Sequence, residues 1–287
     1  SNFNSTIRII AEDFQFSVTV NLLDGYINKE GEYVPKVFVL EPDYLIDVSA
    51  IANCFQGNTG IEQLYLMRKF AATTTSQHMM LGNVANFFLG DAQADFRATF
   101  IKSFQLNPLT FALFEDKTIT EMYQKSKSHF ASLQRLIKEY MPQNGIKKED
   151  CYLEPSFYSE TYGIQGRLDV WQYSEGSPTA TIIELKSGKP FHANRHGISN
   201  DHYTQTILYD LLVRSVFKSK LSPTKYIFYS ALASENLKYA PSLRQQELEA
   251  IKLRNQIIGI ERRLATLDRR PLDQLGILDH LRPEMIA

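Results

Sequence analysis

Two segments are the most informative about the fold of this sequence: Gly166-Arg167-Leu168-Asp169-Val170 and, later, Ile183-Glu184-Leu185-Lys186. Side chains alternate between the two faces of a strand, so Glu184 and Lys186 would share one face while their apolar neighbours enter the core. The turn-forming residues between the two stretches predict a hairpin that places Asp169 beside Glu184. We therefore expect two carboxylates and a lysine to converge at one edge of a sheet.

Two carboxylates beside a lysine suit the hydrolysis of a phosphodiester. Hard cations such as Mg²⁺ take oxygen ligands and keep several waters, so one or two carboxylates and a substrate phosphate are enough to hold them. Such a metal lowers the pKa of a bound water, and Lys186 could orient that water or stabilise developing negative charge. The same residues also fit a purely structural arrangement, a buried Glu–Lys ion pair with an aspartate near a turn. Both interpretations remain open on the spacing alone.

A third pattern follows on the helix expected over 201–217, where Gln205 and Tyr209 lie four residues apart and so on one face. Taken in order, G-x-x-D, (D/E)-x-K and Q-x-x-x-Y resemble the motifs of the PD-(D/E)xK nucleases, specifically their RecB-like branch. The residues of the first two motifs most resemble those of the nuclease domain of the eukaryotic replication helicase-nucleases that trim Okazaki flaps. The resemblance covers roughly residues 49–255. It implies that Gln205 and Tyr209 support the catalytic site.

The resemblance implies a divalent-metal-dependent deoxyribonuclease, either an exonuclease or a flap endonuclease. Its substrate would be single-stranded or flap DNA, and its partner a helicase domain or subunit of a repair, replication or recombination enzyme. Carried over residue by residue, the resemblance places Mg²⁺ or Mn²⁺ on Asp169, Glu184 and the backbone carbonyl of Leu185. It gives Lys186 the role of assisting the attacking water.

Two further residues are weaker candidates for metal ligands. Glu154 matches an acidic position before the first strand of the motif region, and Asn86 stands where the family usually has a histidine four residues after a glycine. Asparagine can offer a carbonyl oxygen to a metal but cannot titrate as imidazole does. This departure leaves a rival from a different class, a nonenzymatic DNA-end-binding or scaffold module that retains the nuclease fold.

The cysteine content bears on a second cofactor. Many members of the resembled family carry an iron–sulfur cluster, but Cys54 and Cys151 are the only cysteines in this sequence. Two thiolates are too few for a four-thiolate cluster or a disulfide framework. We therefore expect no iron–sulfur cluster and a reducing compartment.

Charge and hydropathy narrow the class of protein. The formal net charge of -1 neither suggests nor excludes DNA binding, which would need a local basic patch. No apolar run approaches the roughly 18 residues that a membrane helix needs. We expect a soluble cytoplasmic protein with no membrane partner.

Changes of pattern along the chain predict an α/β protein in three parts. Residues 1–48 form a β-rich region with strands near 14–20 and 36–40. The nuclease core follows over 49–240, and the resemblance implies a restriction-endonuclease-like mixed central sheet flanked by helices, with a helical insertion. Strands are expected over 152–158, 162–173, 179–186 and 225–232.

The last part, 241–287, is predicted to be a long C-terminal helical extension. Its apolar residues recur at alternating spacings of four and three, which makes one seam along a helix. Packing of this seam on its own domain is the simpler interpretation, and docking of another domain or subunit is the alternative. The basic residues of this helix, among them Lys252 and Arg254, predict a solvated face, and contact with DNA is the alternative.

Histidines four residues apart on a helix can chelate a metal ion such as zinc. His192 and His196 are four residues apart, but Asn194, Gly197 and Ser199 around them predict a loop. We expect these histidines to be solvated or to contact phosphate near the site.

Overall fold

The computed structural model describes residues 3–71, 77–90, 95–218 and 221–266, although several side chains of the first helix after residue 76 lie outside that description. Its centre is a five-stranded mixed sheet in the order β12-β11-β10-β9-β6. The strands are β6 (Cys151–Leu153), β9 (Val170–Tyr173), β10 (Thr179–Lys186), β11 (Ser222–Tyr229) and β12 (Leu237–Tyr239). β10 and β11 are parallel, and the other neighbouring pairs are antiparallel. The expected mixed α/β architecture is thus confirmed.

Helices cover both faces of the central strand β10. Ile183 packs on one face against Val84 and Leu133 of a helical insertion. Ile182 packs on the other face against Leu208 of α9 (Asn200–Val216), the crossover helix that joins β10 to the parallel strand β11. A β-branched run buried on both sides is typical of a parallel strand pair, so the sequence of β10 suits its central position.

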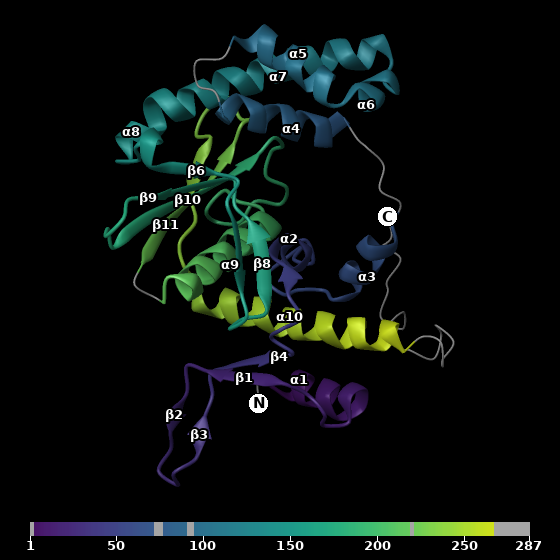
Figure 1. Ribbon diagram of the computed structural model, residues 1–287, viewed down its shortest axis with the longest axis vertical. Coiled ribbons are helices and arrows are strands. Elements are labelled where there is room, and N and C mark those ends of the chain that lie inside the picture. Colours follow the sequence, from purple (N-terminus) through teal and green to yellow (C-terminus); the bar gives the residue numbers. More distant parts are fainter. Residues whose placement is uncertain (1–2, 72–76, 91–94, 219–220, 267–287) are drawn as a thin grey trace.

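The helical insertion lies across the end of the sheet where β10 finishes, above the strands in Figure 1. It comprises α4 (Gln77–Gly90), α5 (Phe96–Leu106), α6 (Pro108–Ala112) and α7 (Asp116–Arg135). A π-helical turn over Leu136–Tyr140 and α8 (Met141–Gln143) lead from α7 back toward the sheet. Two shorter helices, α2 (Val48–Ala52) and α3 (Gln63–Phe70), precede the insertion.

Two predicted strands are each broken into two shorter ones. The segment expected as 152–158 divides into β6 and β7 (Ser156–Ser159) around Glu154, whose φ of +50° is left-handed. The segment expected as 162–173 divides at Leu168 and Asp169 into β8 (Ile164–Arg167) and β9. β7 and β8 join β5 (Ile46–Asp47) in a separate three-stranded sheet. Asp169 therefore stands at the bend between two sheets, where no neighbouring strand competes for its side chain.

The N-terminal region contains a helix that the β-rich interpretation did not predict. α1 (Asn4–Ile9) continues as a π-helix over Ile10–Phe14, and the first strand, β1 (Val20–Leu23), begins only after two residues with left-handed backbone. The prediction of a strand beginning at residue 14 is therefore wrong. The buried Ile10 packs in the main core with residues of the C-terminal helix, and this contact outweighs the local strand preference.

The remaining N-terminal strands agree better with expectation. β4 (Val37–Leu40) coincides with the strand predicted over 36–40 and pairs with β1. β2 (Tyr26–Ile27) and β3 (Tyr33–Val34) form a short separate hairpin.

The C-terminal helix α10 (Arg244–Ala265) packs on its own domain, as the simpler interpretation held. Leu253, Ile257 and Ile260 along its seam are buried, and the helix runs between α9 and the β1–β4 pair in Figure 1. Residues of the extension beyond 266 lie outside the described part of the chain. Within the described residues, no helix is long and apolar enough to cross a membrane.

One basic residue of α10 contradicts the expected solvated face. The Arg254 side chain is fully buried, and its guanidinium donates to the backbone carbonyls of Gly163, Leu40, Glu41 and Tyr44. Burial lowers the pKa of this guanidinium to about 9, and the charge of Glu41 opposes that shift. Lys252, by contrast, is partly exposed and pairs with Glu249 on the surface.

Candidate functional site

The hairpin of β9 and β10 brings Asp169 opposite Glu184. Val170, the first residue of β9, pairs with Ile183 of β10. Asp169, just before β9, therefore comes beside Glu184, the next residue of β10. The backbone N–H of Leu185 donates to Asp169 Oδ2 over 2.7 Å. The aspartate side chain thereby occupies the place of a strand partner and is held against the end of β10. The convergence expected from the sequence is present in the structure.

The two carboxylate oxygens of Glu184 have different surroundings. The residue is 3% exposed, and its Oε1 accepts a hydrogen bond from Lys186 Nζ at 2.9 Å. Its Oε2 is buried and has no hydrogen-bond partner among the described residues. Leaving a charged oxygen buried and unpaired is costly, so such an atom is expected where a ligand or cation binds.

Lys186 is held by a relay of side chains from α9. Its Nζ donates to Gln205 Oε1 at 2.8 Å, and Gln205 Nε2 donates to Tyr209 OH at 3.1 Å. The Tyr209 hydroxyl donates in turn to the Arg167 carbonyl at 2.8 Å. The spacing of four along α9 thus aligns an amide and a phenol on one helical face, and the relay fixes the direction of the lysine.

The glycine of the first motif is explained by the tyrosine of the third. A Cβ built on Gly166 would lie 2.7 Å from the ring of Tyr209, well inside a van der Waals contact. Any larger residue at this position would push the ring and the relay away from Lys186. The spacing of the motifs therefore reflects a direct contact between β8 and α9.

Burial and the charges in the site raise the pKa values of Asp169 and Lys186 relative to their ordinary values. Burial, and then the negative charge of Glu184, raise the pKa of Asp169 to about 8, against the hydrogen bond from the Leu185 N–H. Burial lowers the pKa of Lys186, but the charges of Glu184 and Asp169 more than offset this, so the net shift is upward. The ammonium therefore stays protonated, and Asp169 is protonated more readily than an exposed aspartate.

These groups border a cavity of about 240 Å³ at the end of β10. The insertion closes it from above with Gly82 and Asn83 of α4 and Leu133 of α7, and Ser230 borders it from the end of β11. The remaining lining residues are Asp169, Glu184, Leu185, Lys186 and Ser187.

Asn83 and Ser230 were not predicted as site residues. Ser230 directly follows β11. Because the carboxyl ends of neighbouring parallel strands meet at one edge of a sheet, a prediction that β11 pairs with β10 would have placed Ser230 at the site. Its Oγ also bonds the Nδ1 of the buried His129 at 2.8 Å. No comparable signal in the sequence points to Asn83.

The weaker candidates are placed differently. Glu154 N–H donates to the Asp169 carbonyl at 3.0 Å, but its carboxylate is turned to Arg167, 3.8 Å away, and does not line the cavity. Asn86 belongs to α4, one turn beyond Gly82, and its side chain lies outside the described part of the structure. Among the described residues, no group of three or more His, Cys, Asp or Glu side chains is arranged to hold a metal ion. A cation at this site would therefore rest on the two carboxylates.

Comparison with solved structures identifies chains of similar fold. The sequence matches no family model and no curated protein. A solved structure from Eubacterium rectale, named "Putative exonuclease", aligns with a TM-score of 0.52 at 13% sequence identity, covering 79% of this chain and 84% of that chain. At this identity the likeness concerns the fold alone. The chain thus shares its mixed α/β architecture with a protein that is named as an exonuclease.

Proposed function

We propose that this chain is a divalent-metal-dependent nuclease that hydrolyses phosphodiester bonds in single-stranded or flap DNA. The observation that carries the proposal is the buried Glu184 carboxylate, with one oxygen on Lys186 and the other without a partner, directly across the strand pair from Asp169. A purely structural ion pair would satisfy both oxygens and would not need a second buried acid beside it. This arrangement favours the catalytic interpretation over the structural one.

The oxygen donors fit Mg²⁺ or Mn²⁺. Asp169 and Glu184 offer carboxylates, and the Leu185 carbonyl faces the same edge because a strand residue directs its N–H and C=O toward the same side. Two or three protein oxygens suffice for a cation that keeps several waters and also binds a substrate phosphate. When bound, the metal would supply a Lewis acid for the phosphate and a water of lowered pKa.

The chain's own residues would then orient the reaction. Lys186 is protonated and held by Glu184 and Gln205, so its remaining hydrogen can be donated to the attacking water or to a phosphate oxygen. Tyr209 keeps Gln205 in place through its hydroxyl and the Arg167 carbonyl. Because a protonated lysine has no lone pair, its contribution is orientation and charge stabilisation.

The choice of DNA, and of single strands or flaps, rests on the motif resemblance. A helicase domain or subunit as partner follows from the same resemblance. The name of the Eubacterium rectale protein agrees with a nuclease. We propose these features as properties of this chain to be tested together with cleavage.

Digestion of an end-labelled single-stranded oligonucleotide in Mg²⁺, Mn²⁺ or EDTA tests the proposal. We expect cleavage only with metal, and a loss of at least about 10²-fold in the isosteric variants Asp169→Asn and Glu184→Gln. Glu175→Gln is the matched control, since Glu175 is exposed in the turn of the same hairpin. Cleavage in EDTA, or full activity in both site variants, would contradict the proposal. Binding of the oligonucleotide without any cleavage would identify the nonenzymatic module instead.

A further inference from the structure

The loop over 187–199 leaves the end of β10 and returns directly into α9. It contains Lys189 and Arg195 and no acidic residue. Within the described residues, neither of these cations forms an ion pair, and Lys189 is exposed. The segment that follows the catalytic lysine is therefore a local basic patch in a chain of almost neutral net charge.

Hydrogen bonds hold this loop in a defined shape. Phe191 N–H donates to Ser199 Oγ at 2.7 Å, and Asn194 N–H donates to the Ile198 carbonyl at 2.8 Å. The Asn194 side chain accepts a further bond from His196 N–H at 2.9 Å. Ser199 is itself buried and is bonded through its N–H to Tyr229 OH. The loop is thus anchored at its base.

This anchored loop directs an aromatic side chain into solvent. Phe191 is 76% exposed, and its ring meets the His192 ring edge-on with centroids 4.1 Å apart. His192 has a φ of +46°, in the left-handed region that histidine adopts more often than most residues do.

The start of the loop borders the cavity, and its end is bonded to a residue that precedes one of the lining residues. Ser187 lines the cavity, and Phe191 follows four residues later, within about 14 Å along the chain. At the other end, the Tyr229 that bonds Ser199 immediately precedes the cavity residue Ser230. A strand of nucleic acid with one phosphate in the cavity would pass this loop within a few nucleotides.

We propose that loop 187–199 is a binding subsite for single-stranded nucleic acid, in which Phe191 stacks on an unpaired base and Lys189 and Arg195 contact neighbouring phosphates. The proposal rests on the proposed nuclease function. Exposed aromatic rings among cations are the elements that bind single strands without sequence preference. A paired base has both faces covered within the helix, so this subsite selects unpaired bases beside the scissile phosphate.

A cycle of protein and substrate changes tests the subsite. Binding of fluorescent single-stranded oligonucleotides, each with one abasic position moved stepwise along the strand, is measured by anisotropy in EDTA so that metal-dependent cleavage does not interfere. We expect one abasic position to weaken binding to the wild type by about 5- to 150-fold. Phe191→Ala should lose affinity for the intact strand by the same factor and no longer discriminate that position, and Phe191→Trp should retain both properties.

The control is Phe16→Ala, because Phe16 is similarly exposed at 73% but belongs to the N-terminal region. Lys189→Gln and Arg195→Gln should each reduce the salt dependence of binding. Unchanged affinity in Phe191→Ala, persistent discrimination of the abasic position, or no oligonucleotide binding by the wild type would overturn the proposal.

Cleavage assays separate this result from the proposed function. If both proposals hold, Phe191→Ala cleaves with a raised KM and an unchanged kcat. If the wild type and the Phe191 variants bind the intact and abasic strands as expected but the wild type shows no cleavage, the nuclease function is refuted and the subsite is supported. A wild type that cleaves with metal while Phe191→Ala matches it in KM and binding would refute the subsite alone.

Discussion

Asp169, Glu184 and Lys186 lie together at the end of β10, but the two acids and the lysine have different chemistry. A carboxylate can ligate a cation, whereas a protonated ammonium has no free lone pair. Asp169→Ala and Glu184→Ala should therefore lose both Mn²⁺ affinity and cleavage. Lys186→Ala should keep Mn²⁺ affinity within a few-fold while kcat falls by about 10²- to 10⁴-fold. Calorimetric titration of Mn²⁺ with cleavage assayed in parallel measures both.

The opposite pattern would refute these roles. The proposed mechanism would be contradicted if only Lys186→Ala lost metal affinity. It would also be contradicted if either carboxylate variant kept full activity. Removing a carboxylate also removes repulsion against phosphate, so Asp169→Ala and Glu184→Ala should bind DNA at least as tightly as the wild type.

Buried histidines give the protein a stability that depends on pH. Burial lowers the pKa of His129, and burial together with the charge of Lys186 lowers the pKa of His202 to about 4. In the unfolded chain both titrate near 6.5. Stability falls as the pH drops below 6.5, because the unfolded chain then binds more protons than the folded one, and for His202 this fall continues to about pH 4. The slope is at most about 1.4 kcal/mol per pH unit for each histidine.

Urea denaturation between pH 7.5 and 5 checks this dependence. His129→Gln and His202→Gln should each lose less stability over this range than the wild type does. His192→Gln, on the exposed side of the loop, should follow the wild type. The raised pKa of Asp169 acts with the opposite sign, but it is common to all variants and cancels in the differences. Parallel curves for all four proteins would contradict the prediction.

At the scale of elements, Arg254 fastens α10 to two distant segments. Its guanidinium donates to the Gly163 carbonyl before β8 and to three carbonyls around the end of β4. Gly163 has a φ of +61°, and a Cβ there would lie 2.2 Å from the guanidinium, so the chain leaves room for this contact. Arg254 thus joins three segments that are far apart in the sequence.

Replacing this arginine should be severe. Arg254→Met leaves several buried carbonyls without donors and should lower the free energy of unfolding by about 3 kcal/mol or more. Lys252→Met, on the same helix, removes only a surface pair with Glu249 and should cost less than about 1 kcal/mol. Urea denaturation compares the two. Equal effects would show that the buried guanidinium adds nothing beyond an ordinary surface charge.

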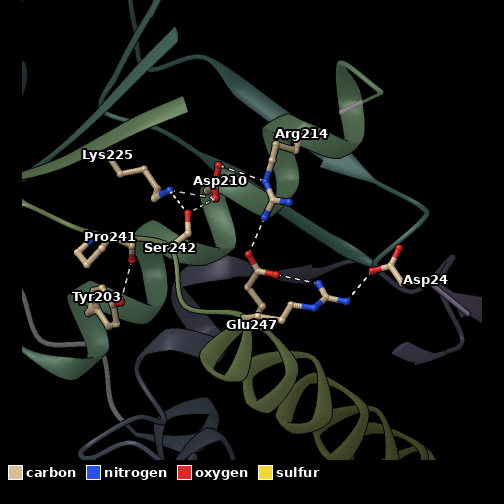
Figure 2. A network of polar contacts seen from close by, with 9 residues as sticks. Asp24, Tyr203, Asp210, Arg214, Lys225, Pro241, Ser242 and Glu247 are labelled. Atoms are coloured by element: carbon tan, nitrogen blue, oxygen red, sulfur yellow. Dashed lines mark hydrogen bonds and ion pairs between the residues drawn. The ribbon is translucent and has the colours of Figure 1, made fainter. Parts of the chain in front are cut away.

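Across the whole molecule, a network of charges links α9, β11, α10 and the turn after β1, as Figure 2 shows. Asp210 pairs with Lys225 at 3.1 Å and with Arg214 at 3.3 Å, and Arg214 reaches Glu247 of α10 at 2.6 Å. Arg244 extends the network from Glu247 to Asp24. Lys225 and Asp210 are both deeply buried, whereas the end at Asp24 is nearly half exposed.

The buried pair should show strong coupling. Asp210→Asn leaves the buried Lys225 without a carboxylate and should cost about 3–5 kcal/mol, whereas Lys225→Met leaves Asp210 paired with Arg214 and should cost less. The double variant should cost much less than the sum, because neither charge is then left unpaired. Asp24→Asn should change stability by less than about 1 kcal/mol, as expected for a partly exposed pair. Denaturation of the four variants measures the coupling, and additive costs would contradict it.

Much of the candidate site follows from local periodicity. Alternation along β10 puts Glu184 and Lys186 on one side, the hairpin pairs Asp169 with Glu184, and a spacing of four aligns Gln205 with Tyr209. These relations depend on residues close in the sequence or on one strand pair, and the strand and helix periods are constant. For that reason the sequence alone was sufficient to bring the acids and the lysine together and to put Gln205 and Tyr209 on one helical face, whereas the contact of that face with Lys186 is tertiary.

Other features arose only in the tertiary structure. The π-helix before β1, the burial of Arg254 and the insertion helices above the cavity all depend on contacts between segments distant in the sequence. Local propensity describes the preference of a segment for strand or helix, but not which surface will cover it. The sequence by itself determined which side chains share a face. The packing of distant elements decided which of those faces are buried and which border the cavity, because burial is a property of neighbours that no local pattern contains.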